Sequence, residues 1–339
     1  MNVSILSVRS GWHTDELLRA LSERGHVGVV VPYEGLVARL GRRGGPSGPP
    51  AGEPEGSPLR SEGIPLFEAD AVLARIIPSG SLEQIIYRVD ALHWLEERGI
   101  PVVNSPRAIE RAVDKFYTSA LLQEAGLPTV ETVVCERAAD AMAAVREFGD
   151  VVIKPIFGSM GHGIVRVSDP DVAFRVVKTL ETTRAVFYVQ RAIDHGGRDY
   201  RLFVIGGRVL AAIERHAADG DWRSNVARGA RAMAFDAPPE WQQMAVRAAA
   251  AIGADYAGVD LLPAPDGRVF VLEVNGIPGW EGLQRATGVD VAGAIVDHVV
   301  LGVRPPSPRR LASRAAKAAL AGRSARGPTW RTSSASKPA

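Results

Sequence analysis

The segment from Tyr256 to Leu283 is the most restrictive part of this chain, because it combines two apolar β-type runs with a Pro-Asp-Gly turn between them. Glu273 and Asn275 are two residues apart on the second run, so their side chains leave the same face of a strand. Asp260 lies on the first run, and a hairpin can bring it to that face. Two carboxylates and an amide oxygen suit Mg²⁺. The alternative is an ordinary exposed hairpin.

A second segment, Val151 to Val167, reads as strand, glycine-rich loop and strand. Lys154 ends the first apolar run, where its ammonium group can reach a phosphate. The glycines allow the backbone N–H groups of the loop to approach an anion. The loop lacks both the G-K-S/T of a Walker loop and a dinucleotide fingerprint that opens a helix. We interpret it as a flap over a nucleotide, with a merely flexible hairpin as the alternative.

A third segment, residues 221 to 230, reads D-W-R-S-N-V-A-R-G-A and lies between these two. Arg223 is followed directly by Ser224 and Asn225 in a short polar stretch without periodicity. A guanidinium group beside a hydroxyl and an amide suits a phosphate site, because it offers several planar donors. A solvated loop has the same composition, so this segment supports a nucleotide site only together with the other two.

In chain order these elements resemble the ATP-grasp superfamily, and within it the RimK-like α-L-glutamate ligases. The resemblance rests on Lys115 followed by K-P-I-F-G-S-M-G-H-G, Y-V-Q-R-A-I, R-D-Y-R-L-F-V-I-G-G-R-V-L-A-A-I-E-R, D-W-R-S-N, A-G-V-D and L-E-V-N-G-I-P-G-W-E-G-L. The E-V-N-x-x-P-G element also occurs elsewhere in the superfamily, including D-alanine–D-alanine ligases. The R-S-N segment and the A-A-I-E-R strand point to the RimK-like branch. The match covers residues 1 to 300 and is strongest from 110 onward.

The resemblance implies roles for individual residues. The implied ATP-binding set is Lys115, Lys154, Gly158, Ser159, Gly161, Gly163, Gln190, Arg191, Ala192, Ile193, Asp199, Arg223, Ser224 and Asn225. Within it, the lysines contact phosphates, the backbone of residues 190–193 binds the adenine edge, and Asp199 lies near the ribose. Asp260, Glu273 and Asn275 hold Mg²⁺, with Mn²⁺ as an alternative. Arg191 stands where the family commonly has an acidic residue, which puts a side-chain contact with adenine in doubt.

The implied activity is ATP-dependent carboxylate–amine ligation. A substrate carboxylate attacks the γ-phosphorus to give an acyl phosphate and ADP, and the amine of an amino acid then displaces phosphate. Arg223 helps to neutralise the developing charge. L-Glutamate is the expected amino acid, and Arg201, Arg215 and Arg228 are candidates for binding its carboxylates. The acceptor stays open between a protein C-terminus, a pterin-type cofactor bearing glutamate, and a small acid.

Two other readings compete with this one. A ligase of another ATP-grasp branch, joining small amino acids, would lack the R-S-N segment. A non-catalytic ATP-binding regulatory protein would be expected to have lost some metal ligands or lysines, and all of them are present. A dehydrogenase is disfavoured, because the first strand is followed by R-S-G-W-H-T rather than G-x-G-x-x-G.

Outside these motifs the chain alternates strands and helices, which favours an α/β and α+β protein with a Rossmann-like N-terminal domain and two ATP-clamping lobes. We expect domains at residues 1–105, 106–195 and 196–303, with a Gly/Pro-rich loop at 41–63 and a tail at 304–339. The predicted strands are Asn2–Val8, Val27–Pro32, Ala71–Ile77, Glu131–Cys135, Val151–Pro155, Gly163–Val167, Ala185–Gln190 and a pair over Arg201–Ile213. The predicted helices are Thr14–Arg24, Leu82–Arg98, Asp114–Ala125 and Glu240–Ala251.

Composition is consistent with a cytoplasmic enzyme. The 339 residues with 46% hydrophobic content can bury a sizeable core. The single cysteine, Cys135, excludes an internal disulfide framework and lies in an apolar run, where packing is the expected role. We expect no signal peptide, because the N-terminus lacks a basic start and a long apolar core, and no membrane contact. The sequence leaves homo-oligomerisation open.

The tail from Arg304 onward contains nine Lys/Arg and no Asp/Glu, whereas the rest of the chain carries a net charge of −7. Its Pro, Ser, Ala and Arg content predicts disorder, with a short helix over Leu311–Ala321 as an alternative. Such a tail can contact nucleic acid, an acidic partner or the acidic body. We favour a solvated extension and do not expect nucleic acid binding.

Deleting Arg304–Ala339 should therefore leave the melting temperature and the turnover of a small acceptor nearly unchanged, because little apolar area is lost. If the tail recruits an acidic macromolecular acceptor, the deletion weakens only that binding, and the effect fades in salt because exposed charges are screened over ~10 Å at 0.1 M. Thermal melting and binding titrations at two salt concentrations measure both effects. A large fall in melting temperature would show that Leu311–Ala321 docks as a helix.

Overall fold

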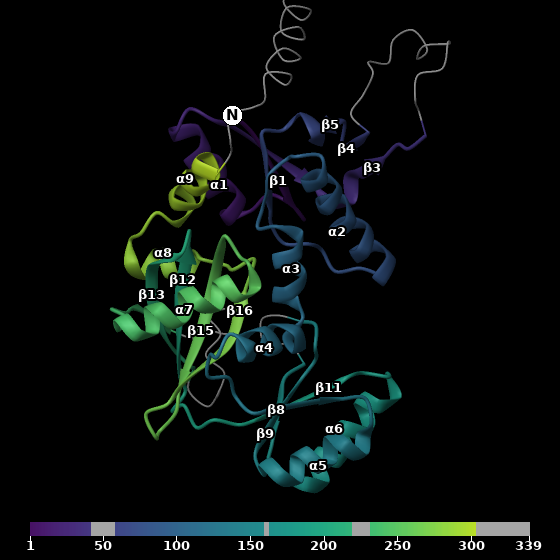
Figure 1. Ribbon diagram of the computed structural model, residues 1–339, viewed down its shortest axis with the longest axis vertical. Coiled ribbons are helices and arrows are strands. Elements are labelled where there is room, and N and C mark those ends of the chain that lie inside the picture. The colour runs from purple at the N-terminus through teal and green to yellow at the C-terminus, as the bar shows by residue number, and fades with distance from the viewer. Residues whose placement is uncertain (42–57, 159–162, 219–230, 303–339) are drawn as a thin grey trace, which may run out of the picture. The chain divides into compact units, whose positions relative to one another are not determined.

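The computed structural model describes residues 1–41, 58–158, 163–218 and 231–302 (Figure 1). The chain separates into one unit over Met1–Leu301 and another over Gly302–Ala339. The description below concerns the first unit. The predicted basic tail, its Leu311–Ala321 helix and most of the predicted loop at 41–63 lie outside the described residues.

The N-terminal part is built on a parallel sheet in the order β2-β1-β6-β7. Its strands are β1 (Asn2–Ser7), β2 (Val27–Pro32), β6 (Ala71–Ala74) and β7 (Val102–Val103), and its helices are α1 (Trp12–Glu23) and α2 (Leu82–Glu97). The buried β-branched and leucine side chains of β1 and β6 are typical of a parallel sheet. Helix α2 begins at a capping box in which Ser81 and Gln84 bond each other's backbone.

A small antiparallel sheet of β3 (Leu36–Ala38), β4 (Leu59–Ser61) and β5 (Ile64–Pro65) follows β2, between the short 3₁₀ turns η1 (Tyr33–Gly35) and η2 (Leu66–Glu68). The prediction of a loop through residue 63 is wrong at its end, because β4 lies inside it. Leu59 is fully buried and anchors this strand in the N-terminal core.

The central part is an antiparallel sheet in the order β10-β9-β11-β8. Its strands are β8 (Thr132–Cys135), β9 (Val151–Lys154), β10 (Val165–Val167) and β11 (Phe187–Arg191). Helices α5 (Ala138–Phe148) and α6 (Pro170–Thr182) cover one face and pack on the alternate residues Ile153, Phe187 and Val189 (Figure 1). Because side chains alternate along a strand, Lys154, Tyr188 and Gln190 occupy the opposite face.

The C-terminal part is an antiparallel sheet in the order β14-β13-β12-β15-β16. Its strands are β12 (Arg198–Ile205), β13 (Arg208–His216), β14 (Arg231–Ala234), β15 (Tyr256–Pro263) and β16 (Val269–Asn275). Helix α7 (Pro239–Ile252) packs on the face formed by Leu202, Val204 and Val259. Gly206 and Gly207 have φ of 54° and 76°, which the tight turn between β12 and β13 requires.

Four further helices complete the described part: α3 (Pro106–Val113), α4 (Lys115–Glu124), α8 (Glu281–Thr287) and α9 (Val291–Gly302). Asp114 caps α4 by accepting a hydrogen bond from the Tyr117 N–H, as its sequence suggests. Leu122 of α4 packs in the core of the C-terminal sheet, although α4 lies in the range predicted for the central lobe. Each large sheet falls within one of the three predicted domain ranges, whose boundaries stay a prediction.

Candidate active site

The predicted metal ligands meet on the β15–β16 hairpin. Asp260 and Glu273 are direct cross-strand partners, and a register shift follows Asp260. The Asn275 amide nitrogen donates to Glu273 Oε1 at 3.1 Å and to the Gly258 carbonyl at 3.3 Å. The Asn275 side-chain oxygen makes no hydrogen bond to another described residue, so it is available to a ligand. The three side chains share one face, as the sequence pattern predicts.

A row of alternating charges crosses four neighbouring strands of this sheet. Asp199 on β12 lies opposite Arg215 on β13, and Arg201 on β12 lies opposite Asp260 on β15. Glu273 on β16 ends the row. Along β12 the charged residues alternate with Leu202 and Val204, which face α7. The charged side chains therefore project from the opposite face of the sheet, which α7 does not cover.

Two arginines bind the carboxylates of this row. Arg201 donates two hydrogen bonds to Asp260, from Nε to Oδ1 at 2.7 Å and from Nη2 to Oδ2 at 2.6 Å. Arg215 binds Asp199 in the same two-point manner, at 2.6 and 2.7 Å, and reaches Asp260 Oδ2 at 3.0 Å. Both arginines were predicted to bind substrate, and here their donors face carboxylates of the protein. Asp199, predicted near the ribose, is buried with both oxygens on Arg215.

The two carboxylates of the hairpin differ in their tendency to ionise. Burial opposes ionisation of Asp260, but the charges of Arg201 and Arg215 outweigh it and hold its pKa well below the usual range. Withdrawal from solvent, followed by repulsion from Asp260, raises the pKa of Glu273. Asp260 therefore ionises more readily than a free aspartate, whereas Glu273 ionises less readily than a free glutamate.

The two predicted phosphate-binding lysines lie beside this row. Lys154 Nζ donates to Gln190 Oε1 at 2.6 Å, so the lysine has a side-chain partner that the sequence did not indicate. Lys115 Nζ donates to the carbonyls of Ile156 and Gly158, at 3.3 and 2.8 Å. Burial lowers the pKa of both lysines, and the negative charge of Glu273 opposes this in each case. The electrostatic influence of Glu273 on both amines links the lysines to the hairpin.

Lys154 should make nucleotide binding and stability depend on pH, because burial lowers its pKa to about 8 from 10.5. Since the unfolded chain holds the proton up to the higher value, stability should rise between about pH 8 and 10.5. Lys154→Met should remove that rise and weaken ATP binding about tenfold or more, because a charge-assisted hydrogen bond to phosphate is lost.

Melting temperature against pH and calorimetric titration with ATP measure these two effects. Lys178→Met is a matched control, because Lys178 is exposed on α6 and contacts Glu181 and the ring of Phe174. Unchanged nucleotide affinity in Lys154→Met would remove this lysine from the site.

The predicted adenine-binding segment, residues 190–193, spans the last two residues of β11 and the two residues that follow it. The Arg191 N–H donates to the Glu131 carbonyl and the Ala192 N–H to the Asp150 carbonyl, both at 2.9 Å. Hydrogen bonding to adenine would therefore fall to Ile193 and to carbonyl groups. The Arg191 side chain donates to Glu131 at 2.8 Å and lies over the Phe148 ring, 4.6 Å from its centroid. Its guanidinium is thus engaged within the protein.

Several predicted site residues lie outside the described ranges: Ser159, Gly161, Arg223, Ser224, Asn225 and Arg228. The two described glycines of the flap, Gly158 and Gly163, have φ of 141° and 72°. A side chain is strained at such angles, which is consistent with the need for glycine at both ends of the loop.

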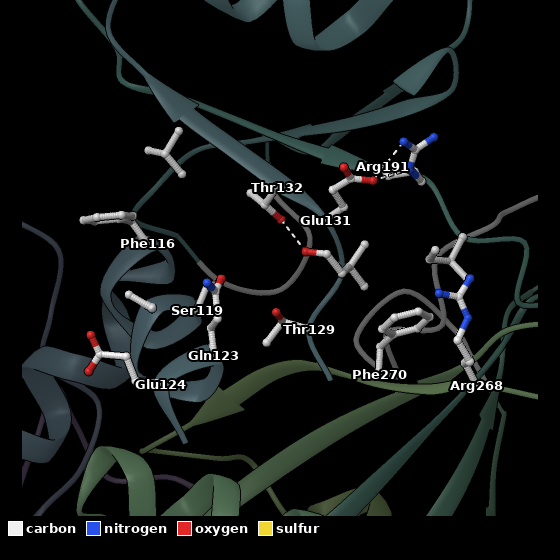
Figure 2. Close-up of a pocket in the computed structure, with 14 residues that line it drawn as sticks. Phe116, Ser119, Gln123, Glu124, Thr129, Glu131, Thr132, Arg191, Arg268 and Phe270 are labelled. Carbon is white, nitrogen blue, oxygen red and sulfur yellow. Dashed lines mark hydrogen bonds and ion pairs between the residues drawn. The ribbon is translucent and has the colours of Figure 1, made fainter. Parts of the chain in front are cut away.

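A pocket of about 720 Å³ lies beside the adenine-binding strand. Figure 2 shows Phe116, Gln123 and Glu124 of α4 on one side, and Arg268 and Phe270 on the other. The pocket also reaches Arg191 and Ile193, but neither predicted phosphate lysine nor any predicted metal ligand lines it. Sequence reasoning missed the α4 and β16 residues of this pocket, because they come from separate segments with no motif.

The donor set of the hairpin fits a hard divalent cation. It offers a carboxylate that is ionised at all ordinary pH values, a second carboxylate directly opposite, and an amide oxygen without a protein partner among the described residues. Within the described ranges there is no group of three or more His, Cys, Asp or Glu side chains placed to hold a metal ion. The predicted set of Asp260, Glu273 and Asn275 does not belong to that class, because it combines two carboxylates with an amide.

The fold is that of the ATP-grasp ligases. The chain superposes with a TM-score of 0.69 on the ATP-grasp ligase PsnB in complex with a minimal precursor, at 23% identity over 88% of this chain and 98% of that one. That likeness establishes the fold. None of the described helices is long and apolar enough to span a membrane.

Residues 112–299 match the RimK-like ATP-grasp domain family. A tetrahydromethanopterin:α-L-glutamate ligase of Methanosarcina acetivorans is 35% identical over 69% of this chain and 81% of its own length. A probable α-L-glutamate ligase of Trichodesmium erythraeum is 33% identical over 88% of this chain and 96% of its own length. The chain belongs to the RimK-like ATP-grasp family, and it is an ATP-dependent ligase that joins a carboxylate to an amine.

Proposed function

We propose that this ligase adds L-glutamate, through its α-amino group, to an acceptor carboxylate by way of an acyl phosphate. The observation that carries the proposal is the meeting of Asp260, Glu273 and Asn275 on one face, with two half-buried lysines under the electrostatic influence of Glu273. The names of the glutamate-ligase relatives support the choice of amino acid.

The proposed reaction has two steps. An acceptor carboxylate oxygen attacks the γ-phosphorus of ATP, the bond to the β-phosphate oxygen breaks, and ADP leaves. The glutamate amine then attacks the acyl carbon, loses a proton, and displaces inorganic phosphate to leave an amide. We assign no general base to the proton transfer.

The residues of the chain position these groups. Lys115 and Lys154 hold the phosphates, the backbone of residues 190–193 holds the adenine, and Asp199 lies toward the ribose. Arg223, Ser224 and Asn225 complete the phosphate and acyl site, with Arg223 neutralising charge in the transition state. Asp260, Glu273 and Asn275 hold Mg²⁺, which supplies charge neutralisation at the phosphates when bound.

The described arginines constrain how glutamate is bound. Arg201 and Arg215 each direct Nε and Nη2 to a protein carboxylate, so a substrate carboxylate would have to be bound by their remaining Nη donors. Arg228 keeps its proposed role as a partner of the glutamate carboxylates.

The experiment is a screen of amino acids and acceptors with ATP and Mg²⁺, measuring ADP release and product mass. Three acceptor classes are compared: peptides with a free C-terminal carboxylate, pterin-type cofactors bearing glutamate, and small carboxylic acids. A mass gain of one glutamate residue on one class identifies the acceptor. ADP release with small neutral amino acids but not with glutamate would favour a ligase of another ATP-grasp branch.

A further inference from the structure

Arg201 lies against two of the predicted metal ligands. Its guanidinium makes two hydrogen bonds to Asp260 and lies 3.9 Å from Glu273 Oε1, while its side chain is only 16% exposed. The Arg201 side chain passes close to Gly258: a Cβ there would lie at van der Waals distance, 3.5 Å, from both Cδ and Nε of Arg201, and at a tighter 3.0 Å from Pro278 Cβ. Arg201 therefore lies across β15 toward the carboxylates.

The two arginines of the row are held differently. Arg215 is 3% exposed, binds both oxygens of Asp199, and touches Asp260 through a single contact. The side-chain hydrogen bonds and ion pairs of Arg201 within the described residues go to Asp260 and Glu273. Arg215 can keep its two bonds to Asp199 while the environment of Asp260 changes, whereas the polar partners of Arg201 in the described part of the chain are predicted metal ligands.

We propose that Arg201 is a built-in counter-cation, which neutralises Asp260 and Glu273 and is displaced when a divalent cation binds with the nucleotide. This inference rests on the proposed metal site. With Arg201 in place, the row has three carboxylates and two guanidinium groups, a net charge of −1 if all five are ionised. Its departure makes the charge −2. The free enzyme therefore binds a bare divalent cation weakly and requires the additional anionic oxygens of the triphosphate.

The proposal also accounts for the position of Arg201 on β12 rather than in a loop. Cross-strand pairing with Asp260 fixes its Cα, so only the side chain has to move. The move ends a two-point hydrogen bond, which the new contact between cation and carboxylates has to offset. Arg201 is thereby a positioning residue that sets metal affinity.

The first test measures Mn²⁺ binding to the full-length protein without nucleotide, from the electron paramagnetic resonance signal of free Mn²⁺. Arg201→Gln keeps a hydrogen-bond donor but removes the charge, and we expect Mn²⁺ to bind about tenfold more tightly or better. Arg198→Gln is the matched control: Arg198 lies on the same strand, is exposed, and approaches Glu214 at 3.7 Å. Its Mn²⁺ affinity should stay within about twofold of the wild type, because exposed pairs contribute little. Unchanged or weaker binding in Arg201→Gln would overturn the proposal.

Glu273→Gln separates failure of this inference from failure of the metal site itself. Loss of Mn²⁺ binding in Glu273→Gln without any tightening in Arg201→Gln would refute the counter-cation role alone. Retained Mn²⁺ binding in Glu273→Gln would refute the metal site and with it the inference.

The second test uses the wild-type chain and so does not depend on how a variant folds. A crystal structure with Mg²⁺ and a non-hydrolysable ATP analogue should show the Arg201 guanidinium more than 4 Å from both Asp260 oxygens, beyond ion-pair distance, with Arg215 still on Asp199. An Arg201 that keeps both hydrogen bonds to Asp260 beside a bound metal ion would contradict the proposal.

Discussion

Replacing Glu273 by glutamine should lower kcat by about 100-fold or more while leaving the fold intact, because a metal ion at a transferring phosphate stabilises the transition state by several kcal/mol. Glutamine keeps the volume and the hydrogen-bonding capacity toward Asn275, but it removes the charge that faces the metal. Removal of that charge also relieves repulsion from Asp260, which raises the pKa of Glu273. The melting temperature should therefore stay level or rise slightly.

The measurement is ADP release under saturating ATP, together with thermal melting. Glu136→Gln serves as the control, since Glu136 is exposed at the end of β8 and away from the row of charges. Near-normal turnover in Glu273→Gln, or loss of the folded state, would mean that the hairpin is structural and that the proposed metal site is wrong.

The hairpin could be predicted from sequence because each of its signals is local. The apolar runs, the turn at Pro265 to Gly267 and the spacing of Glu273 and Asn275 define two strands and a shared face without reference to the rest of the chain. The structure places the strands at Tyr256–Pro263 and Val269–Asn275, with Asp260 opposite Glu273. Family resemblance extended this to the fold, which the matching structures confirm.

The partners of the charged residues could not be predicted in the same way. The sequence points Arg201 to substrate and Lys154 to phosphate without their protein partners, because Asp260 and Gln190 are distant in sequence. Such contacts depend on the register between strands, and a shift of one residue would move every side chain to the other face. The arginine–carboxylate row is therefore visible only in the assembled sheet.

Some helices were missed for a different reason. No helix was predicted over α5, although its buried residues Ala138, Ala141, Ala144, Val145 and Phe148 follow helical spacing. Helix α6 carries clear start signals, with Asp169 as the N-cap and Pro170 at the first position, that were not used. Both cover the far face of the central sheet, so their omission left the site prediction unaffected.

Replacing Arg215 by methionine should destabilise the protein by about 3–5 kcal/mol, the largest stability effect we expect, because it leaves buried charge uncompensated. Asp199 is 5% exposed and would lose both hydrogen bonds to Arg215. Asp260 is 1% exposed and would keep only Arg201. The deficit should shrink in acid, since protonation of a carboxylate removes the buried charge.

Urea unfolding followed by tryptophan fluorescence measures the loss, with Arg268→Met as the matched control. Arg268 also contacts a carboxylate closely, at 2.6 Å from Asp266, but its side chain is 70% exposed, so its loss should change the free energy of unfolding little. Adding Asp199→Asn to Arg215→Met should recover part of the stability, because it removes one of the buried negative charges that Arg215 balances. Equal losses in Arg215→Met and Arg268→Met, or no recovery in the double variant, would show that the row of charges is not held by mutual compensation. Arg215 would then be placed for substrate, as the sequence alone suggested.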